Sequence, residues 1–466
     1  MTVNGMQRLR VSGNNRFLER GDGTLFFWLG DTAWELFHRL DRDEAKRYLV
    51  NRAGLGFNVI QAVALAEFEG ATTPNAHGRL PFKAGADGMP DPLRPDMDGP
   101  YSYWDHVDYI VDAAAELGLY VALLPTWGDK FHQAFGFGPE ILNLSNARAY
   151  GEWIGARYRD RANIVWVLGG DRWLTTRTHF DLVNEMAEGL AAGDDGSHLM
   201  TFHPPGGQTS STFMHREPWL DFNMIQSGHR HLGERQSDRL VAADYARTPV
   251  KPVLDGEPCY EDHPRDHDAE KNGYFDAADV RTAAYYAVLS GAFGHTYGHN
   301  SVWSMAKEAG DRFIMTWEQA LDRPGAMQMG HLRNLIETRT GPGRMPDPAM
   351  IEGNRSGANR MAASRDAGCA LLYSPNGIPF YAALDRLEAG LVRASWSDPR
   401  SGGMTDAGEY RGKGTWLFVP PSSGRGEDWV LVLEADPLDG EEGSRIREGM
   451  NGSEECGKRG NEDGRS

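Results

Sequence analysis

The chain has few cysteines, no long apolar run and no surplus of positive charge. Only three of its 466 residues are cysteine, so a disulfide framework is not expected. No apolar stretch approaches the roughly 20 residues of a membrane helix, and no secretion signal is visible. The balance of 48 basic and 66 acidic residues gives a net charge of −18, which argues against a phosphate backbone as partner. We therefore expect a cytoplasmic protein that binds neither nucleic acid nor a membrane.

Tryptophan and histidine, by contrast, are frequent. The chain has 13 Trp and 15 His. Trp and Tyr present flat apolar faces with a polar edge, which suits stacking on sugar rings. A core rich in aromatic side chains explains the same composition. Composition alone leaves both interpretations open.

Strand-like and helix-like patterns alternate over the first 340 residues, which predicts an α/β fold. Eight apolar runs are strand candidates, at 25–34, 57–67, 119–127, 163–171, 198–205, 221–229, 251–258 and 292–300. Amphipathic patterns follow most of them, at 42–52, 104–117, 147–158, 180–190, 237–245, 280–289 and 326–338. The interval 206–220 is too short for a confident helix. Eight such units predict a (β/α)₈ TIM barrel over residues 1–340. An open doubly wound sheet is the alternative, but it requires a glycine-rich phosphate turn where this chain has Gly30–Asp31–Thr32.

The composition changes after residue 340. The segment GPGRMPDP (341–348) has the Pro and Gly content of a linker. Short strand-like segments then follow without helical crossovers, at 369–374, 379–384, 391–398, 415–421 and 428–434. This pattern predicts a small antiparallel β-sandwich over residues 349–434. The acidic, glycine-rich tail (435–466) cannot bury enough apolar surface to fold, so we expect it to be disordered.

Catalytic groups in a barrel project from the carboxyl ends of the strands, so the residues at those ends are informative. Two of them are carboxylates that follow glycine: Asp171 ends NIVWVLGGD and Glu257 lies in KPVLDGEP. Cleavage of a glycosidic bond needs one carboxylic acid and one carboxylate. A helix cap is the ordinary role of a single carboxylate at such a turn. Two in matching contexts favour a catalytic pair.

Other polar and aromatic residues near the strand ends are candidates for binding a sugar. They are Asp31, Trp34, Trp127, His203, His229, Tyr260, His295 and His299. Asp31 could equally cap a helix. His229, His231 and His295 could form a zinc site instead, but the first strand, which usually supplies metal ligands in metal-dependent barrel hydrolases, carries no histidine. We therefore expect neither a metal nor a cofactor.

Several motifs together resemble one family. FFWLGDTAWELF, GFNVIQAVALAEFEG, NIVWVLGGD and KPVLDGEPCYE, followed by ASWSDPRSGG and FVPPSSGRGEDWVLVLE, resemble the apiosidase-like glycoside hydrolases. This bacterial family has a (β/α)₈ barrel and a small β-sandwich that is often labelled collagen-binding. The resemblance covers residues 8–434.

The resemblance implies hydrolysis of a carbohydrate substrate, a plant-derived oligosaccharide with apiose as the best-known sugar. By motif match, Asp171 would be the general acid/base and Glu257 the nucleophile, with retention of configuration. Carboxyl groups more than about 6.5 Å apart would favour inversion instead. Two other hypotheses stay open: a barrel that binds carbohydrate without cleaving it, and a metal-dependent hydrolase that uses the rim histidines His229, His231 and His295. The sequence carries no indication of the oligomeric state.

Overall fold

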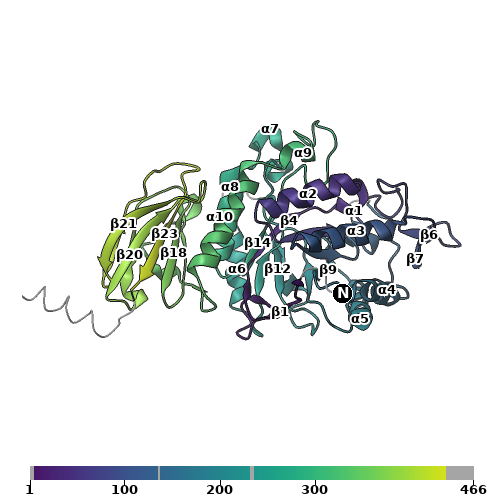
Figure 1. Ribbon diagram of the computed structural model, residues 1–466, viewed down its shortest axis with the longest axis horizontal. Helices are drawn as coiled ribbons and strands as arrows, with labels where there is room; N and C mark the ends of the chain where they lie inside the picture. The colour runs from purple at the N-terminus through teal and green to yellow at the C-terminus, as the bar shows by residue number, and fades with distance from the viewer. Residues whose placement is uncertain (1–4, 135–136, 231–235, 437–466) are drawn as a thin grey trace, which may run out of the picture.

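The computed structural model describes residues 5–134, 137–230 and 236–436. Two parts are visible in Figure 1: a barrel of strands surrounded by helices, and a smaller stack of antiparallel strands beside it. His231 and the tail from residue 437 lie outside the described residues. The expected disorder of that tail therefore stays a prediction.

Eight parallel strands form a nearly closed barrel, as predicted. Their order in the sheet is β10-β9-β8-β5-β4-β14-β13-β12. The two end strands, β10 and β12, also lie close together. Two hydrogen bonds join β10 to the residues just before β12: Asp221 N donates to the Met200 carbonyl (2.9 Å), and the Thr201 hydroxyl donates to the Phe222 carbonyl (2.7 Å). The alternative of an open doubly wound sheet is therefore wrong. The strands are β4 (Trp28–Thr32), β5 (Val59–Val63), β8 (Tyr120–Leu124), β9 (Ile164–Gly169), β10 (Met200–His203), β12 (Asn223–Gln226), β13 (Val253–Asp255) and β14 (Gly294–Tyr297).

Helices follow the strands where the amphipathic patterns predict them. Asp41 and Ser102 begin two of these helices with capping boxes, which satisfy backbone N–H groups of the first turn. Between β10 and β12 there is only a short strand, β11 (Gln208–Thr209), and one 3₁₀ turn, as the short interval indicated. The main helices are α2 (Arg42–Gly54), α3 (Tyr103–Glu116), α4 (Ala147–Tyr158), α5 (Arg177–Asp194), α6 (Ser237–Tyr245), α8 (Ala277–Leu289) and α10 (Pro324–Arg339).

A small antiparallel sheet precedes the barrel, which the sequence did not predict. It consists of β1 (Leu9–Val11), β2 (Leu18–Arg20) and β3 (Leu25–Phe26). Leu18 and Phe26 are buried in the same apolar cluster as Trp28 and the inward-facing Val59 of the barrel. Phe26 also packs edge-on against Tyr120, the first residue of β8. The sheet therefore covers the amino-terminal end of the barrel and leaves the carboxyl end for the site.

Two antiparallel sheets form the second part of the chain. One has the order β15-β17-β18-β23-β20-β21 and the other the order β16-β19-β22. The segment expected to be a linker (341–348) contains a short strand, β15, which pairs with β17. β21 was not predicted, since its sequence MTDAGEYR is polar and largely exposed. The strands are β15 (Met345–Pro346), β16 (Ile351–Glu352), β17 (Ala362–Arg365), β18 (Cys369–Ser374), β19 (Phe380–Ala383), β20 (Leu391–Ser397), β21 (Met404–Arg411), β22 (Thr415–Phe418) and β23 (Trp429–Ala435).

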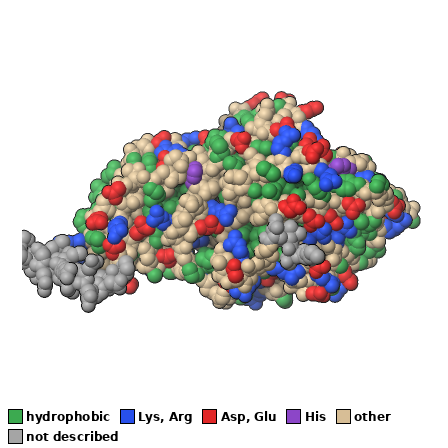
Figure 2. Space-filling model, in the orientation of Figure 1, with side chains coloured by type: hydrophobic (Ala, Val, Ile, Leu, Met, Phe, Trp, Pro, Cys, Tyr) green, Lys and Arg blue, Asp and Glu red, His purple; other side chains and the backbone are tan. Residues whose placement is uncertain are grey.

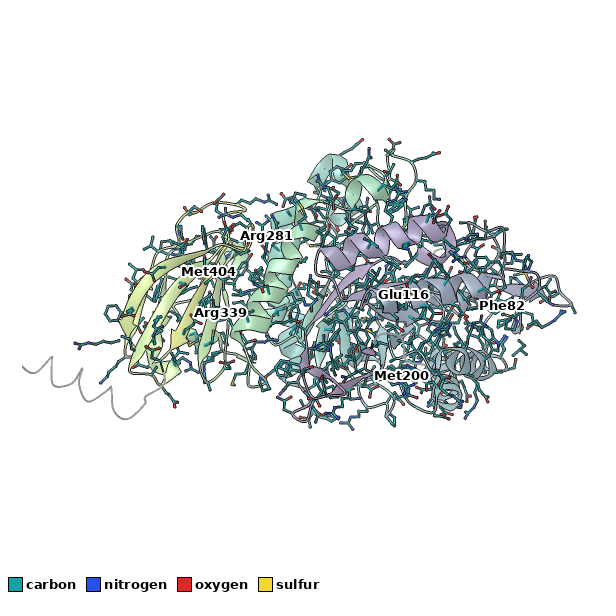
Figure 3. The ribbon with its side chains drawn as sticks, viewed as in Figure 1. Phe82, Glu116, Met200, Arg281, Arg339 and Met404 are labelled. Atoms are coloured by element: carbon teal, nitrogen blue, oxygen red, sulfur yellow. The ribbon has the colours of Figure 1, made fainter. Side chains whose placement is uncertain are left out.

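Helices α8 and α10 lie between the barrel strands and the sandwich (Figure 1). The buried guanidinium of Arg281, on α8, pairs with Asp428 at 2.5 Å, and the rings of Tyr285 and Tyr373 stack 4.8 Å apart. Arg281 and Arg339 are labelled at this junction in Figure 3. The sandwich is thus attached to the outer helices of the barrel.

The surface carries charges of both signs. On the face shown in Figure 2, acidic and basic side chains are interspersed, and the described residues there form no continuous basic patch. None of the helices in the described ranges is long and apolar enough to cross a membrane.

Candidate active site

The two predicted carboxylates lie in one cavity at the carboxyl end of the barrel. Asp171 follows β9 and Glu257 follows β13, and both line a hollow of about 430 Å³. This volume falls within the about 300–1,000 Å³ of ligand sites in proteins. Loops after other strands complete the walls with Trp34, Glu67, Phe68, Trp127, His229, Tyr260, His263, Pro264, His267, Asn300, Trp303, Asp311 and Arg312.

The turn after β9 requires its two glycines. Gly169, Gly170 and Asp171 have φ angles of 94°, 108° and 56°, a left-handed region that side chains disfavour. A Cβ on Gly170 would lie 2.6 Å from the Gly128 nitrogen, and one on Gly169 would lie 2.5 Å from the His203 carbonyl oxygen. Only glycine fits beside these backbones. The GGD motif therefore sets the position of Asp171.

Asp171 is placed to carry a proton near neutral pH. Burial and the negative charge of Glu257 raise its pKa to about 7. Its Oδ1 accepts a hydrogen bond from Gly206 N at 3.3 Å, and Arg172 Nη1 lies 3.8 Å from its Oδ2. The side chain keeps 36% of its surface open, toward the cavity. A carboxyl group that is both protonated and accessible can act as a general acid.

Glu257 is held in the opposite state. His203 Nε2 lies 2.9 Å from its Oε2, and His229 Nε2 lies 3.2 Å from its Oε1. Burial by itself raises the pKa of this carboxyl, but the two imidazoles outweigh burial and lower it to about 2. Glu257 is therefore a carboxylate; its Oε1 is hydrogen-bonded to His229, and its Oε2 lies in ion-pair distance of His203.

Aromatic side chains surround Glu257 and the two histidines beside it. The rings of Trp34 and Trp127 lie 5.1 Å apart, and the imidazole of His203 packs against both, at 5.4 and 5.5 Å. Trp34 Nε1 donates to the Tyr260 hydroxyl at 3.1 Å. Tyr260 in turn packs against His229, with ring centres 4.4 Å apart. Of the predicted sugar-binding residues, four line the cavity: Trp34, Trp127, His229 and Tyr260. His203 does not line it but contacts Glu257, which does.

Three of the predicted sugar ligands do not line this cavity. Asp31 is fully buried on the outer side of β4, where Arg52 Nε and the Tyr48 hydroxyl donate to its Oδ2 at 2.7 and 2.5 Å. The reason is the alternation of side chains along a strand: Trp28 and Gly30 face inward, so Asp31 faces the helices. The prediction that Asp31 binds a sugar hydroxyl is therefore wrong.

The predictions for His295 and His299 are wrong for similar reasons. His295 is fully buried beside Thr296, whose hydroxyl accepts from Trp28 inside the barrel at 3.1 Å. His295 thus lies on the outer face of β14, and burial lowers its pKa to about 3. His299 is also fully buried; its Nδ1 accepts from Ser301 N, and its Nε2 donates to Asp262 at 3.0 Å. Both histidines are structural.

Four residues around Asp171 and Glu257 were not predicted as site residues: Arg172, Glu67, His263 and His267. Arg172, buried beside Asp171, donates from Nη2 to Glu67 Oε1 at 2.7 Å. His263 stacks on His229 with ring centres 4.2 Å apart and packs 5.1 Å from His267. Glu67 follows the second strand in the sequence, so its position was a usable signal. His263 and His267 belong to a long loop, and nothing local in the sequence places them near His229.

The histidines that the sequence offered as zinc ligands do not form a metal site in the described residues. Within the described ranges, no three His, Cys, Asp or Glu side chains are placed to hold a metal ion. His229 is directed at Glu257, whereas His295 lies on the outer face of β14. The proposed zinc ligands His229 and His295 therefore do not converge, and His231 lies outside the described residues.

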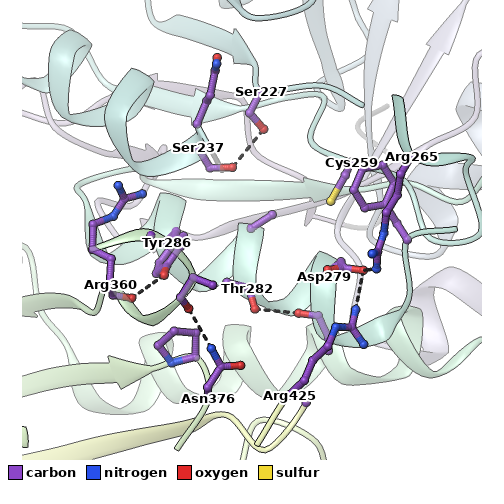
Figure 4. Close-up of a pocket in the computed structure, with 18 of the residues that line it drawn as sticks. Ser227, Ser237, Cys259, Arg265, Asp279, Thr282, Tyr286, Arg360, Asn376 and Arg425 are labelled. Atoms are coloured by element: carbon purple, nitrogen blue, oxygen red, sulfur yellow. Dashed lines mark hydrogen bonds and ion pairs between the residues drawn. The ribbon is translucent and has the colours of Figure 1, made fainter. Parts of the chain in front are cut away.

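A separate cavity of about 540 Å³ lies between the barrel and the sandwich (Figure 4). Arg265 and Arg425 both reach toward Asp279 in this view, and their Nη2 atoms lie 2.5 and 2.9 Å from its Oδ2. Asp279 is the single carboxylate among the described lining residues. This cavity therefore lacks the pair of carboxylates that glycoside cleavage requires.

Comparisons with known proteins match both parts of the chain to family models. The family model described as "Apiosidase-like, catalytic domain" matches residues 12–341. A second model, "Putative collagen-binding domain of a collagenase", matches residues 345–434. A search of curated proteins found no match.

Solved structures are similar over nearly the whole chain. One named "Glycoside hydrolase" is 35% identical with a TM-score of 0.85, and the match covers 94% of this chain and 99% of that one. A glycoside hydrolase family 5 structure from Bacteroides vulgatus is 34% identical with a TM-score of 0.84, covering 93% and 94%. An endo-1,4-beta-mannanase from Rhizomucor miehei shares the fold at 13% identity and a TM-score of 0.50, over 71% of this chain and all of that one. Because the catalytic-domain model spans most of the chain, this protein belongs to the apiosidase-like glycoside hydrolases.

Proposed function

We propose that the chain hydrolyses glycosides by double displacement, with Asp171 as general acid/base and Glu257 as nucleophile. In the first step a Glu257 oxygen attacks the anomeric carbon, the glycosidic C–O bond breaks, and the proton of Asp171 passes to the leaving oxygen. In the second step Asp171 takes a proton from water, and the water oxygen displaces Glu257. The products are a sugar of retained configuration and a free alcohol.

The observation that carries this proposal is the opposite charge state of two carboxyl groups in one cavity. The pKa of Asp171 is raised to about 7 and that of Glu257 is lowered to about 2. One group that holds its proton and one that is ionised are what an acid and a nucleophile require at the same pH. His203 and His229 contribute by keeping Glu257 ionised and oriented.

The substrate we propose is a plant-derived oligosaccharide, with apiose as the first sugar to test. The match to an apiosidase-like catalytic domain supports this choice. So do the indole rings of Trp34 and Trp127 in the cavity wall, because aromatic faces stack on sugar rings.

The experiment is hydrolysis of a panel of aryl glycosides and apiose-bearing oligosaccharides by the wild-type protein and by Glu257→Gln. We expect the substitution to lower kcat on the best substrate on the order of 10³-fold or more, since the covalent route is lost. Glu116→Gln, at the exposed end of α3, is the matched control and should retain wild-type activity. The anomer released first, followed by NMR, reports retention.

Near-wild-type turnover by Glu257→Gln would contradict the assignment of the nucleophile. Release of the inverted anomer would reassign Glu257 as a general base that activates water. Binding of oligosaccharides without any hydrolysis would favour a barrel that binds carbohydrate without cleaving it.

A further inference from the structure

A further cavity lies at the amino-terminal end of the barrel, where Phe27 and Phe293 come directly before β4 and β14. Its volume of about 380 Å³ falls within the about 300–1,000 Å³ of ligand sites. The small sheet β1–β3 with its loops, the last turns of α10 and the segment after α10 form its walls. Half of the described lining residues are apolar: Phe17, Leu25, Phe26, Phe27, Phe293 and Ile336. The cavity can therefore hold the apolar body of a small organic molecule.

The charged side chains of this cavity are mostly basic. Three arginines line it, Arg20, Arg333 and Arg344, together with one carboxylate, Glu337. Glu337 already pairs with Arg333 at 3.0 Å on α10. In the part of the chain that the structure describes, Arg20 and Arg344 form no ion pair; Arg20 Nη1, for example, donates to the Leu25 carbonyl at 3.4 Å. Two guanidinium groups at this cavity thus lack a counter-charge in contact.

Arg344 is the more unusual of these two arginines because it is buried. Only 4% of its surface is exposed, and burial lowers its pKa to about 10, so it stays charged at neutral pH. Its Nη1 and Nη2 donate to the carbonyls of Val288 and Ala292, the second at 2.7 Å. A guanidinium has five N–H groups, so donors remain for a ligand. Because a buried charge without a counter-charge is costly, an anion in the cavity would be bound favourably.

Two negative features near Arg344 do not replace such an anion. Asp366 acts on Arg344 only from a distance, since its oxygens accept from the backbone nitrogens of Gly341, Gly368 and Cys369. The carboxyl end of α10 carries about half a negative charge. This is small beside three guanidinium groups that are opposed by one carboxylate.

Aromatic rings hold both unpaired guanidinium groups against the apolar wall. The guanidinium carbon of Arg344 lies 5.4 Å from the ring centre of Phe17, and that of Arg20 lies 5.1 Å from the ring centre of Phe26. A phenyl face attracts a cation but does not neutralise it. The ligand that suits this wall has an anionic group next to an apolar body.

We propose that this cavity binds a small organic anion, a carboxylate on a ring-sized apolar body. The carboxylate accepts hydrogen bonds from Arg344, Arg20 adds positive charge, and the body packs against the phenylalanines of the wall. The planar guanidinium group matches the geometry of a carboxylate. The site does not depend on glycoside cleavage, because it lies at the opposite end of the barrel from Asp171 and Glu257.

The experiment is isothermal titration calorimetry of the full chain with benzoate, benzamide and inorganic phosphate. Benzamide has the shape of benzoate without its charge. We expect benzoate to bind at least about tenfold more tightly than benzamide, because benzamide forms no charge-assisted hydrogen bond with a guanidinium group. Benzoate should also bind more tightly than phosphate, since phosphate has no apolar body to cover the wall.

Two variants assign the binding to this cavity. Arg344→Met should weaken benzoate binding at least about tenfold, since it removes the charge and keeps an apolar side chain. Arg20→Met, at a partly exposed position, should weaken it about threefold. Arg10→Met, in β1 of the same small sheet, is the matched control, because Arg10 pairs with Glu19 and does not line the cavity. It should bind benzoate as the wild type does.

Four results overturn the proposal. Absence of benzoate binding at about 10 mM means that the cavity takes no such anion. Equal binding of benzamide means that charge is not recognised, and tighter binding of phosphate removes the assignment of an apolar body. Benzoate binding that Arg344→Met and Arg20→Met both leave unchanged lies elsewhere in the molecule. Thermal unfolding shows whether each variant is folded; if Arg344→Met is not, the comparison of Arg20→Met with Arg10→Met decides.

Discussion

His203 Nε2 lies 2.9 Å from Glu257 Oε2, although the two residues are 54 positions apart in the chain, and His203 ends β10 whereas Glu257 follows β13, a strand that does not neighbour β10 in the sheet. The imidazole is fully buried and packs against the indole rings of both Trp34 and Trp127. Two tryptophans thus fix the histidine, and the histidine fixes one oxygen of the carboxylate. The ionised state of Glu257 depends on this contact, because burial acts in the opposite direction.

Replacing His203 should therefore shift the acidic side of the pH profile. His203→Phe keeps an aromatic ring against the two tryptophans but removes the contact with Glu257. The pKa of Glu257 then rises, so the acid limb of kcat/KM should move to higher pH by about one pH unit or more. The measurement is kcat/KM against pH on the best aryl glycoside, with thermal unfolding to show that the variant is folded. An unchanged acid limb in a folded variant would show that His203 does not act through Glu257.

Asp171 should determine the alkaline side of the same profile. As an acid it must be protonated, and its pKa is raised to about 7, so kcat/KM should be high below that pH and fall as the pH rises through it. Asp171→Asn should lower the rate about 10²- to 10⁴-fold on substrates with poor leaving groups. The loss should be far smaller with activated leaving groups, and the alkaline limb should disappear. An alkaline limb that persists in Asp171→Asn would assign the acid to another residue.

The arrangement of the barrel could be predicted from the sequence because each strand-and-helix unit has its own hydrophobic periodicity. The helical patterns predicted at 147–158 and 237–245 correspond to α4 and α6 without any difference in bounds. The sheet β1–β3 was missed because its strands have only two or three residues. Strands this short are recognised by the strands with which they pair, and the hydrophobic periodicity of one segment does not reveal its partner.

Position at the end of a strand brought Asp171 and Glu257 to one rim, but it did not separate them from His299, which also follows a strand and is fully buried. Asp171 and Glu257 lie beyond the last residues of β9 and β13, so the loop carries them to the rim. Asp31 and His295 lie inside β4 and β14, and there the alternation of faces decides which way a side chain points. Assigning inward and outward positions from Trp28 onward would have excluded Asp31.

The burial of Asp31 gives a test of that correction. Asp31→Asn leaves Arg52 buried without its counter-charge, and removing one partner of a buried pair costs about 3–5 kcal/mol. We expect a lower melting temperature, measured by circular dichroism, with kcat/KM of the folded enzyme within about twofold of wild type, since no cavity contact is lost. Asp43→Asn, at an exposed position of α2, is the control. A rise in KM without loss of stability would return Asp31 to the substrate site.

The pair Arg281–Asp428 tests whether the sandwich braces the barrel. Arg281 Nη2 lies 2.5 Å from Asp428 Oδ1, both side chains are almost completely buried, and the Tyr373 hydroxyl also donates to Asp428 at 3.0 Å. Arg281→Met leaves the Asp428 carboxylate buried without its cation, so the free energy of unfolding should fall by about 3–5 kcal/mol. Urea denaturation measures this change, and kcat/KM should not alter, because no sandwich residue is among the described residues that line the catalytic cavity.

The double variant Arg281→Met/Asp428→Leu separates the cost of an unpaired charge from the worth of the contact. Buried ion pairs that are replaced as a whole by apolar side chains often lose little stability. The double variant should therefore be more stable than Arg281→Met alone, despite carrying more substitutions. If the two variants are equally destabilised, the loss comes from packing between α8 and the sandwich. If neither differs from wild type, the two parts are held together elsewhere, with Arg339–Glu434 and the stacked Tyr285 and Tyr373 as the next contacts to remove.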